Sequence, residues 1–403
     1  MTLEFEKLTD DLRQMAQQAA RRQQQRAEQV VDILQALRQY ATDWEAIDQA
    51  LAQGRQKGDE KHYRSARPLS QDTPLNAQID PPTPPTQATI IATDGSQIVP
   101  DRHAAFLYYL INIGVFVYNH GQANTPQPFT VPDIHYLEEG QFEEEFMIGS
   151  GQVSIKRDLA EIGTLAKTTW LEKDTAEFPL LSILDQRLLY WPIGSTGAAA
   201  QATVEKWCEK MTDIRRCGAL LAGYIDRPGK SSVVTLLQSL TAGPDFNWKT
   251  LGKAGSNQGI TDTYLFSRLL TPGQRSCLFL DVSPANDRFA TIDPHNQICF
   301  FYLNPGSVGQ AIARIDIPLW VAEQPDAVDQ VHALIYDQCQ ILGDYPYVLA
   351  RADEMAVVGK RDQAELDAMI ELHMQRQGLE GDITAKQGSK NLARGGRTRH
   401  EGV

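Results

Sequence analysis

The sequence predicts an α/β protein, in which a mixed β-sheet is flanked by helices and preceded by a helical arm at the N-terminus. Short runs of β-branched and aromatic residues recur after residue 88, and segments with helical apolar spacing lie between them. The chain has 403 residues, of which 42% are hydrophobic and 22% are charged, so it can bury a large core. Two or three structural units are expected at this length.

The first 53 residues (1–53) are expected to be helical. Leu8, Leu12, Met15 and Ala19 recur at spacings of three and four, whereas the segment "RRQQQRAEQ" is polar on nearly every face. Such an arm either joins two chains or folds back on its own body, and the sequence leaves both interpretations open. Residues 54–87 become polar and then proline-rich, which is typical of an extended linker.

The remaining elements are expected within one domain that spans residues 88–378. Strands are predicted at 88–94, 104–119, 178–191, 217–226, 277–282, 297–303 and 313–320, and residues 122–148 are expected to be a polar insertion. Helices are predicted at about 151–172, at 326–342, from Pro346 onward and near 361–377. A basic tail without core residues, 379–403, is expected to be disordered.

Charge and cysteine content narrow the class of protein. The formal net charge is −13, which argues against a protein that coats nucleic acid indiscriminately but allows a local basic groove. Five scattered cysteines without a CxxC pair are typical of reduced thiols in a cytoplasmic protein. The charged N-terminus and the lack of a long apolar run predict neither a secretory signal nor a membrane span.

Three acidic residues stand out by their positions in the predicted elements. Asp94 ends the first strand of the domain, Asp185 ends the strand at 178–191, and Glu161 lies in the helix between them, one turn after Arg157. If the two strands are parallel neighbours, their carboxyl ends lie side by side, where open α/β sheets place their sites. Converging carboxylates select hard cations such as Mg²⁺ or Mn²⁺, and two such ions can promote phosphodiester cleavage.

Each acid also has a simpler explanation. The "DG" at Asp94 is common in hairpin turns, Glu161 could be a helix acid paired with Arg157, and Asp185 could cap the next segment. The cluster Glu138, Glu139, Glu143, Glu144 and Glu145 is interpreted as a solvated face. The order of strand acid, crossover-helix acid and strand acid favours a site, because it is the order found in ribonuclease H-like sheets.

Six stretches resemble the NurA nuclease family, which has a ribonuclease H-like core. They are "IIATDGSQI", "RDLAEIGTLA", "LSILDQRLLYW", "LLAGYIDRPGKSSVV", "GITDTYLFSRLL" and "YPYVLARADEMAVV". The resemblance implies an Mn²⁺- or Mg²⁺-dependent deoxyribonuclease that acts in DNA end processing and double-strand break repair. It also implies a HerA-type hexameric ATPase as partner and a homodimer as assembly. Asp94, Glu161 and Asp185 would be the catalytic residues and metal ligands.

The resemblance has one departure. Archaeal relatives typically have a histidine in the helix after the "YP" element, and the matching position here is Asp353. A carboxylate could still bind Mn²⁺ or Mg²⁺, or it could mark a branch with altered activity. Asp353 could also be a first-turn helix acid that the helix dipole favours.

Three cations are candidates for gripping the DNA backbone: Arg227, Lys230 and Arg268. The amide groups of the helix after "RPGKSS" could help to hold a phosphate, although the upstream glycine of a P-loop is missing. Ordinary surface cations are the alternative. His332 lies beside an apolar helical stripe and is expected to be a core or edge histidine.

Two other functions are compatible with the sequence. The chain could be a non-catalytic adaptor that docks on a hexameric DNA translocase, with the acids serving as turns and caps. It could also act on RNA or R-loops with the same metal chemistry, because sugar discrimination depends on groove contacts that sequence does not show.

Overall fold

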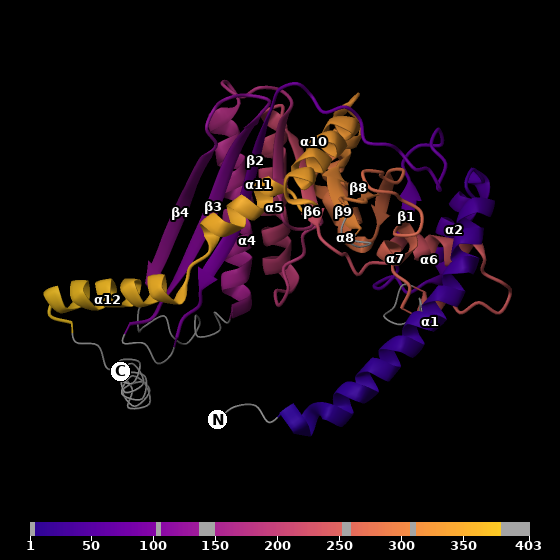
Figure 1. Cartoon of the computed structure of the whole chain (residues 1–403), viewed down its shortest axis with the longest axis horizontal. Helices are drawn as coiled ribbons and strands as arrows, with labels where there is room; N and C mark the ends of the chain where they lie inside the picture. The colour runs from indigo at the N-terminus through magenta and orange to yellow at the C-terminus, as the bar shows by residue number, and fades with distance from the viewer. Residues whose placement is uncertain (1–4, 102–105, 137–149, 252–258, 307–311, 380–403) are drawn as a thin grey trace. The chain divides into compact units, whose positions relative to one another are not determined.

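The computed structural model describes residues 5–101, 106–136, 150–251, 259–306 and 312–379 (Figure 1). The chain forms two compact units. The first, called the arm unit, comprises Met1–Thr86, Leu184–Tyr190 and Ala219–Tyr347. The second, called the meander unit, comprises Gln87–Ile183, Trp191–Gly218 and Val348–Val403.

Among its described residues, the meander unit has strands in the spatial order β5-β2-β3-β4. Strands β2 (Ala88–Ile98), β3 (Tyr108–His120) and β4 (Gln127–Tyr136) form an antiparallel meander. The chain then passes through helix α4 (Ser150–Glu172) and returns as β5 (Leu180–Leu184) beside β2. A meander followed by a helical crossover to its first strand confirms the predicted ribonuclease H-like sheet.

Strand β2 continues through Asp94 instead of ending there. Asp94 pairs with Gly114 of β3, and the pairing extends to Ile98 opposite Leu110. The sequence "TDGS" is therefore part of a strand and not a hairpin turn, so the prediction that the strand ends on Asp94 is wrong. Long pairing with the apolar strand β3 overrides the local turn preference of Asp-Gly.

The described residues of the meander unit also form helices α5 (Gly197–Arg216), α11 (Tyr347–Ala356) and α12 (Lys360–Arg376). Helix α5 packs beside α4, whereas α11 and α12 come from the end of the chain. Figure 1 shows α11 crossing the β2–β3 pair and α12 continuing from it. Side chains Leu366 and Ile370 of α12 pack on Ile98 and its neighbours, so the C-terminal helices belong to this sheet.

The arm unit has a five-stranded run in the order β1-β7-β8-β9-β6. Its strands are β1 (Ser65–Pro68), β6 (Leu220–Ile225), β7 (Phe279–Val282), β8 (Ile298–Leu303) and β9 (Ala313–Pro318). Its helices are α1 (Thr9–Gln39), α2 (Trp44–Lys57), α6 (Ser232–Leu240), α7 (Asp262–Phe266), α8 (Pro284–Ile292), α9 (Leu319–Ala322) and α10 (Ala327–Leu342). Strands β7, β8, β9 and β6 pair antiparallel in turn.

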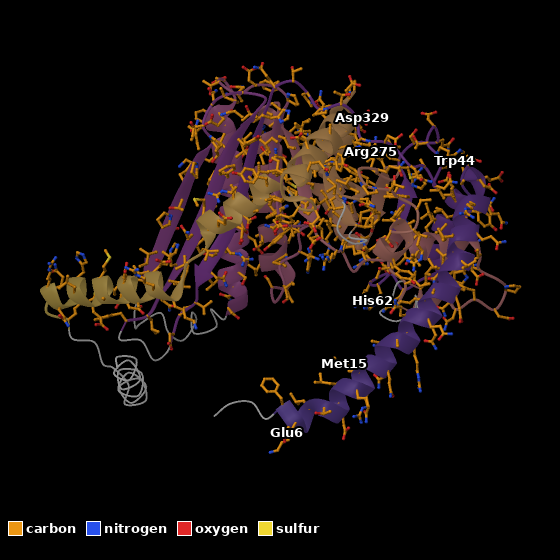
Figure 2. The ribbon with its side chains drawn as sticks, viewed as in Figure 1. Glu6, Met15, Trp44, His62, Arg275 and Asp329 are labelled. Atoms are coloured by element: carbon orange, nitrogen blue, oxygen red, sulfur yellow. The ribbon has the colours of Figure 1, made fainter. Side chains whose placement is uncertain are left out.

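The N-terminal arm is helical, as predicted, but its two halves differ in burial. Val30, Ile33 and Leu37 of α1 are buried in a core that also includes residues of α2, α6 and β7. Earlier in α1 the same periodic positions are open, and Met15 is 62% exposed (Figure 2). The arm therefore folds onto its own unit through its second half.

The proline-rich segment after α2 is also structured. It contains β1, which pairs antiparallel with β7, and the fully buried Leu75. Strand β4 and helices α5 and α8 are not among the elements predicted from the sequence. Strand β4 is exposed on both faces, so it lacks the alternation that identifies a strand. Among the described residues, no helix combines the length and the apolarity needed to cross a membrane.

Candidate functional site

The alternation of side chains along β2 divides its polar residues between the two faces of the sheet. Asp94 lies opposite Gly114 and Ser96 lies opposite Asn112, so these four residues share one face. Helix α11 covers that face. Gly95 points to the other face, which α4 covers.

Helix α11 is fastened to the β2–β3 pair at its C-terminal end. The Ser96 hydroxyl donates to the Ala356 carbonyl oxygen, and the Asn112 amide donates to the same oxygen at 2.8 Å and to that of Met355 at 3.3 Å. These bonds satisfy carbonyls that a helix end leaves without intrahelical partners. A Cβ at Gly114 would overlap with the backbone of α11, so the missing side chain permits the close approach.

This docking brings Asp353 of α11 to Asp94 of β2. The two carboxyl groups lie close enough to interact, and Asp94 accepts a hydrogen bond from the Gly95 amide at 2.8 Å. Burial raises the pKa of Asp94 to about 6; the Gly95 amide opposes the rise, Asp353 adds to it, and Arg157 opposes it. The Asp94 carboxyl group therefore keeps its proton at pH values well above its ordinary pKa, unless a cation takes the place of that proton.

Arg157 and Glu161 of α4 approach from the other face. The stem of Arg157 lies over Gly95, where a Cβ would be 2.9 Å from its Cγ. Burial lowers the pKa of Arg157, but Asp158, Glu161 and Asp94 outweigh it, so the pKa is raised. Glu161 is only 3% exposed, and its backbone oxygen accepts from the Thr93 hydroxyl at 3.4 Å. Arg157 therefore interacts electrostatically with both Asp94 and Glu161, and Asp94 in turn interacts with Asp353.

We expect the contribution of Asp94 to the stability of the metal-free protein to fall as the pH rises from 4 to 7. Because the folded-state pKa of Asp94 is raised, its protonated form favours the native state below about pH 4, and this contribution is lost as the pH passes about 6. Asp94→Asn should remove the loss, on the order of 1–3 kcal/mol at pH 7. Melting temperatures of both proteins across this range, in chelator, measure it. Parallel pH profiles for the two proteins would contradict the assignment.

The donor chemistry of this site fits a hard divalent cation. Two carboxyl groups in contact need a proton or a cation between them, and carboxylate oxygens are the preferred ligands of Mg²⁺ and Mn²⁺. Within the described residues, however, no three acidic, histidine or cysteine side chains converge closely enough to form a complete metal-binding cluster. The two carboxyl groups would supply only part of a coordination shell.

Asp185 immediately follows β5, as predicted, and is exposed. It belongs to the segment Leu184–Tyr190 of the arm unit, whereas Asp94, Glu161 and Asp353 belong to the meander unit.

The three candidate DNA-binding cations belong to the arm unit and have different environments. The side chain of Arg227 is 72% exposed, and its backbone φ is 46°, in the left-handed region. Lys230 donates to Asp281 at 3.5 Å. Arg268 lies 3.5 Å from the centre of the Tyr264 ring and donates to the Tyr264 carbonyl oxygen.

The N-terminus of α6, which follows Lys230 in the sequence, is already hydrogen-bonded to a carboxylate. The amides of Val233 and Val234 in α6 donate to the buried carboxylate of Asp262, at 3.1 and 2.9 Å. These two amides are therefore not available to a phosphate. The Asp262 amide in turn donates to the Lys230 carbonyl oxygen, which holds the Lys230 loop against α7.

Other residues singled out in the sequence lie away from these contacts. His332 is fully buried, burial lowers its pKa to about 4, and its Nε2 lies 2.7 Å from the Gly273 carbonyl oxygen, as expected for a core histidine. All five cysteines are free thiols. The glutamate cluster at 138–145 and residues 380–403 lie outside the described residues.

The residues that hold α11 on the sheet are not among the predicted site residues. Gly114 interrupts the strand "LINIGVFV", and a glycine inside such a strand indicates close approach of another backbone. Asn112 lies two residues earlier on the same face. Both residues are visible in the sequence, but the helix that packs on them is more than 200 residues further along the chain, so the sequence does not identify it.

Together, the strand order and the acidic residues on β2, α4 and α11 define a ribonuclease H-like α/β protein with a carboxylate site on its first long strand. Residues 88–358 match the NurA domain, and the chain belongs to the NurA family. The predicted family is confirmed.

Solved structures with a similar fold include the NurA nuclease from Sulfolobus solfataricus, with 10% sequence identity, a TM-score of 0.42, and coverage of 87% of this chain and 95% of that one. A NurA structure with manganese has 12% identity and a TM-score of 0.35, covering 74% and 91%. The catalytic domain of human endonuclease V has 11% identity and a TM-score of 0.31, covering 73% and 92%. A comparison with curated protein sequences found no match.

Proposed function

We propose that this protein is a metal-dependent nuclease that hydrolyses phosphodiester bonds in DNA. The observation that carries the proposal is the Asp94–Asp353 contact on β2 and α11, in a chain of the NurA family. A carboxyl group with a raised pKa beside a second carboxyl group is typical of a functional site. The similar structures whose names include NurA nuclease and manganese agree with this choice of activity and ion.

In this proposal Asp94, Glu161, Asp185 and Asp353 hold Mn²⁺ or Mg²⁺. The inclusion of Asp185 rests on the sequence order of strand acid, helix acid and strand acid. The bound ion would supply Lewis acidity and lower the pKa of the attacking water. Arg157 balances the charge of Asp94 and Glu161, and the seat of α11 keeps Asp353 beside Asp94.

We further propose that Arg227, Lys230 and Arg268 contact the DNA backbone. The side chain of Arg227 is 72% exposed, compared with 38% for Lys230. The cation of Arg268 is held on the Tyr264 ring. Lys230 would have to share its charge with Asp281.

A nuclease assay tests the proposed activity. End-labelled single- and double-stranded DNA, and RNA of the same sequence, are incubated with the purified protein and Mn²⁺, Mg²⁺ or chelator. We expect degradation of DNA only when a divalent ion is present. Preferential cleavage of RNA would show that RNA is the substrate instead of DNA. If the protein cleaves no nucleic acid and Mn²⁺ does not raise its melting temperature, the result would favour the non-catalytic adaptor function.

A homodimer and a HerA-type ATPase partner are part of the proposal, together with a cytoplasmic role in DNA end processing. The family resemblance supports them, and the first half of α1 leaves Leu12 and Met15 52% and 62% exposed, at helical spacing. We expect this stripe to pair two chains.

Light scattering after size-exclusion chromatography should therefore give twice the chain mass of 44.9 kDa. The double variant Leu12→Glu and Met15→Glu should shift it to the monomer, because charges in an apolar contact are costly to bury. Ile193→Glu, at a site 78% exposed in the other unit, is the matched control and should remain dimeric. A monomeric wild-type protein would rule out the dimer.

A further inference from the structure

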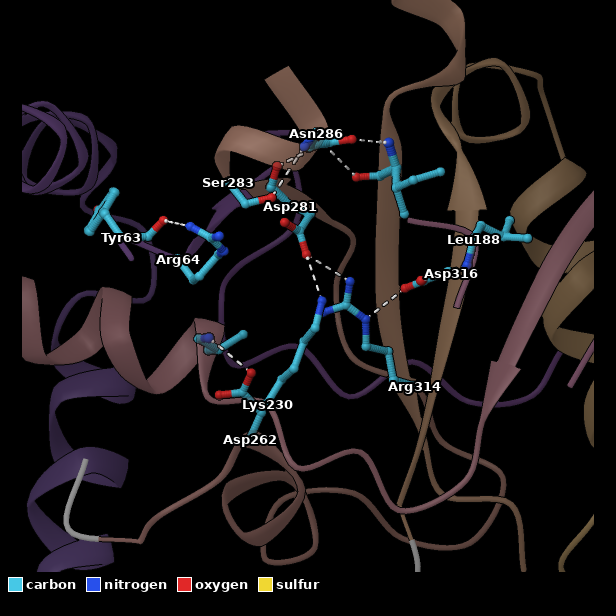
Figure 3. Close-up of polar contacts among 12 residues, drawn as sticks. Tyr63, Arg64, Leu188, Lys230, Asp262, Asp281, Ser283, Asn286, Arg314 and Asp316 are labelled. Carbon is cyan, nitrogen blue, oxygen red and sulfur yellow. Dashed lines mark hydrogen bonds and ion pairs between the residues drawn. The ribbon is translucent and has the colours of Figure 1, made fainter. Parts of the chain in front are cut away.

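The arm unit contains a network of buried charges around Arg314, whose two carboxylate partners have no role in the proposed reaction. Arg314 of β9 is 1% exposed and lies between two carboxylates, as Figure 3 shows. Its Nε donates to Asp316 at 2.7 Å, and its Nη2 donates to Asp281 of β7 at 2.9 Å. The guanidinium also lies over the Phe300 ring, 3.7 Å from its centre.

Asp281 and Arg314 stay ionised although they are buried. Burial alone would raise the pKa of Asp281, but Lys230 and Arg314 outweigh it and lower the pKa to about 2. Burial would lower the pKa of Arg314, yet Asp316 and Asp281 raise it. A buried ion network of this kind contributes little net stability compared with apolar residues, so a role in holding a defined geometry is the better explanation.

Asp316 holds the segment that follows Asp185. One of its oxygens binds Arg314, and the other accepts from the backbone amide of Leu188 at 3.2 Å. Gly223 of β6 pairs with Asp316 and lies against the same segment, because a Cβ there would overlap with the Gln186 carbonyl oxygen. Residues 186–188 are therefore seated on β6 and β9 three residues or fewer after the proposed ligand.

We propose that Asp316, held by Arg314, is a positioning residue for Asp185. The inference rests on the proposed function, in which Asp185 is a metal ligand. Residues that hold a metal ligand in place set the orientation of that ligand. Their loss typically costs about 10- to 100-fold in metal affinity or activity. Asp316 has no contact with substrate in this scheme and acts through the Leu188 amide.

The test compares two substitutions in the same buried network. Asp316→Ala removes the acceptor of the Leu188 amide, whereas Asp281→Ala removes the other carboxylate of Arg314, which is also buried, and leaves that acceptor in place. Both should destabilise the protein. Only Asp316→Ala should raise the Mn²⁺ concentration for half-maximal DNA cleavage and lower kcat, by about 10- to 100-fold.

Hydrogen exchange of the peptide around Leu188, followed by mass spectrometry, gives a readout that does not need activity. Faster exchange in Asp316→Ala than in Asp281→Ala is expected, and Asp316→Asn, which keeps an acceptor oxygen, should restore much of the protection. Equal effects of the two alanine variants on cleavage or on exchange would overturn the proposal, because they would show a purely structural role.

A second variant protects the test against misfolding of Asp316→Ala. Gly223→Ala displaces the Gln186 carbonyl oxygen and leaves every charge of the network in place, so it should reproduce the same kinetic loss. Normal cleavage by Gly223→Ala with fast exchange of the Leu188 amide would also overturn the positioning role. If the wild-type protein cleaves no nucleic acid, the proposed function fails, while the exchange comparison still decides whether Asp316 anchors this segment.

Discussion

Asp94→Asn should reduce metal-dependent DNA cleavage by about 100-fold or more, since removal of a ligand should cost at least as much as removal of its support. Asparagine keeps the shape of the side chain and the acceptor for the Gly95 amide, which lies 2.8 Å from Oδ1. It removes the negative charge that binds a cation and that meets Asp353. The loss should therefore appear in activity and not in stability.

Steady-state cleavage of linear DNA, with circular dichroism and melting curves for each protein, measures this separation. Asp133→Asn is a matched control, because it makes the same change at an exposed acid of β4 that pairs with His135 at 2.9 Å. The control should keep its activity. Cleavage by Asp94→Asn within about tenfold of the wild type would refute the assignment, and the same substitution at Asp185 tests the strand acid of the arm unit.

Gly114→Val should lower the free energy of unfolding by about 3 kcal/mol, the upper end for overpacking a well-packed site. Its side chain would have to displace the α11 backbone at Ala352 and Ala356, against which Gly114 is packed. The Asn112 and Ser96 bonds to Ala356 would stretch, and Asp353 would move away from Asp94. DNA cleavage should fall together with stability.

Urea denaturation of Gly114→Val and Gly163→Ala provides the comparison. Gly163 lies inside α4, and a Cβ there would meet nothing within 4 Å. Alanine at that helical position should stabilise the protein by about 0.5–1 kcal/mol. A valine at position 114 that changes neither stability nor cleavage would show that α11 is not held on this face through Gly114.

Much of the sheet could be predicted because its strands are apolar runs with clear ends. The run "LLSIL" before Asp185 and the helix with Glu161 were located correctly, since burial on both sides of a strand and one side of a helix leaves a direct trace in sequence. Strand β4 could not be predicted, because all but one of its residues are exposed. The end of β2 was misplaced because Asp-Gly is locally a turn sequence.

The sequence by itself determined the identity of the acids and their order along the chain, because residue type and periodicity are local properties. Only the tertiary structure decided that Asp353, on a helix more than 250 residues later, lies against Asp94. That contact depends on a glycine that admits a helix backbone and on two polar side chains that bind its last carbonyls. Close packing between distant segments depends on the shapes of both, which no local pattern records.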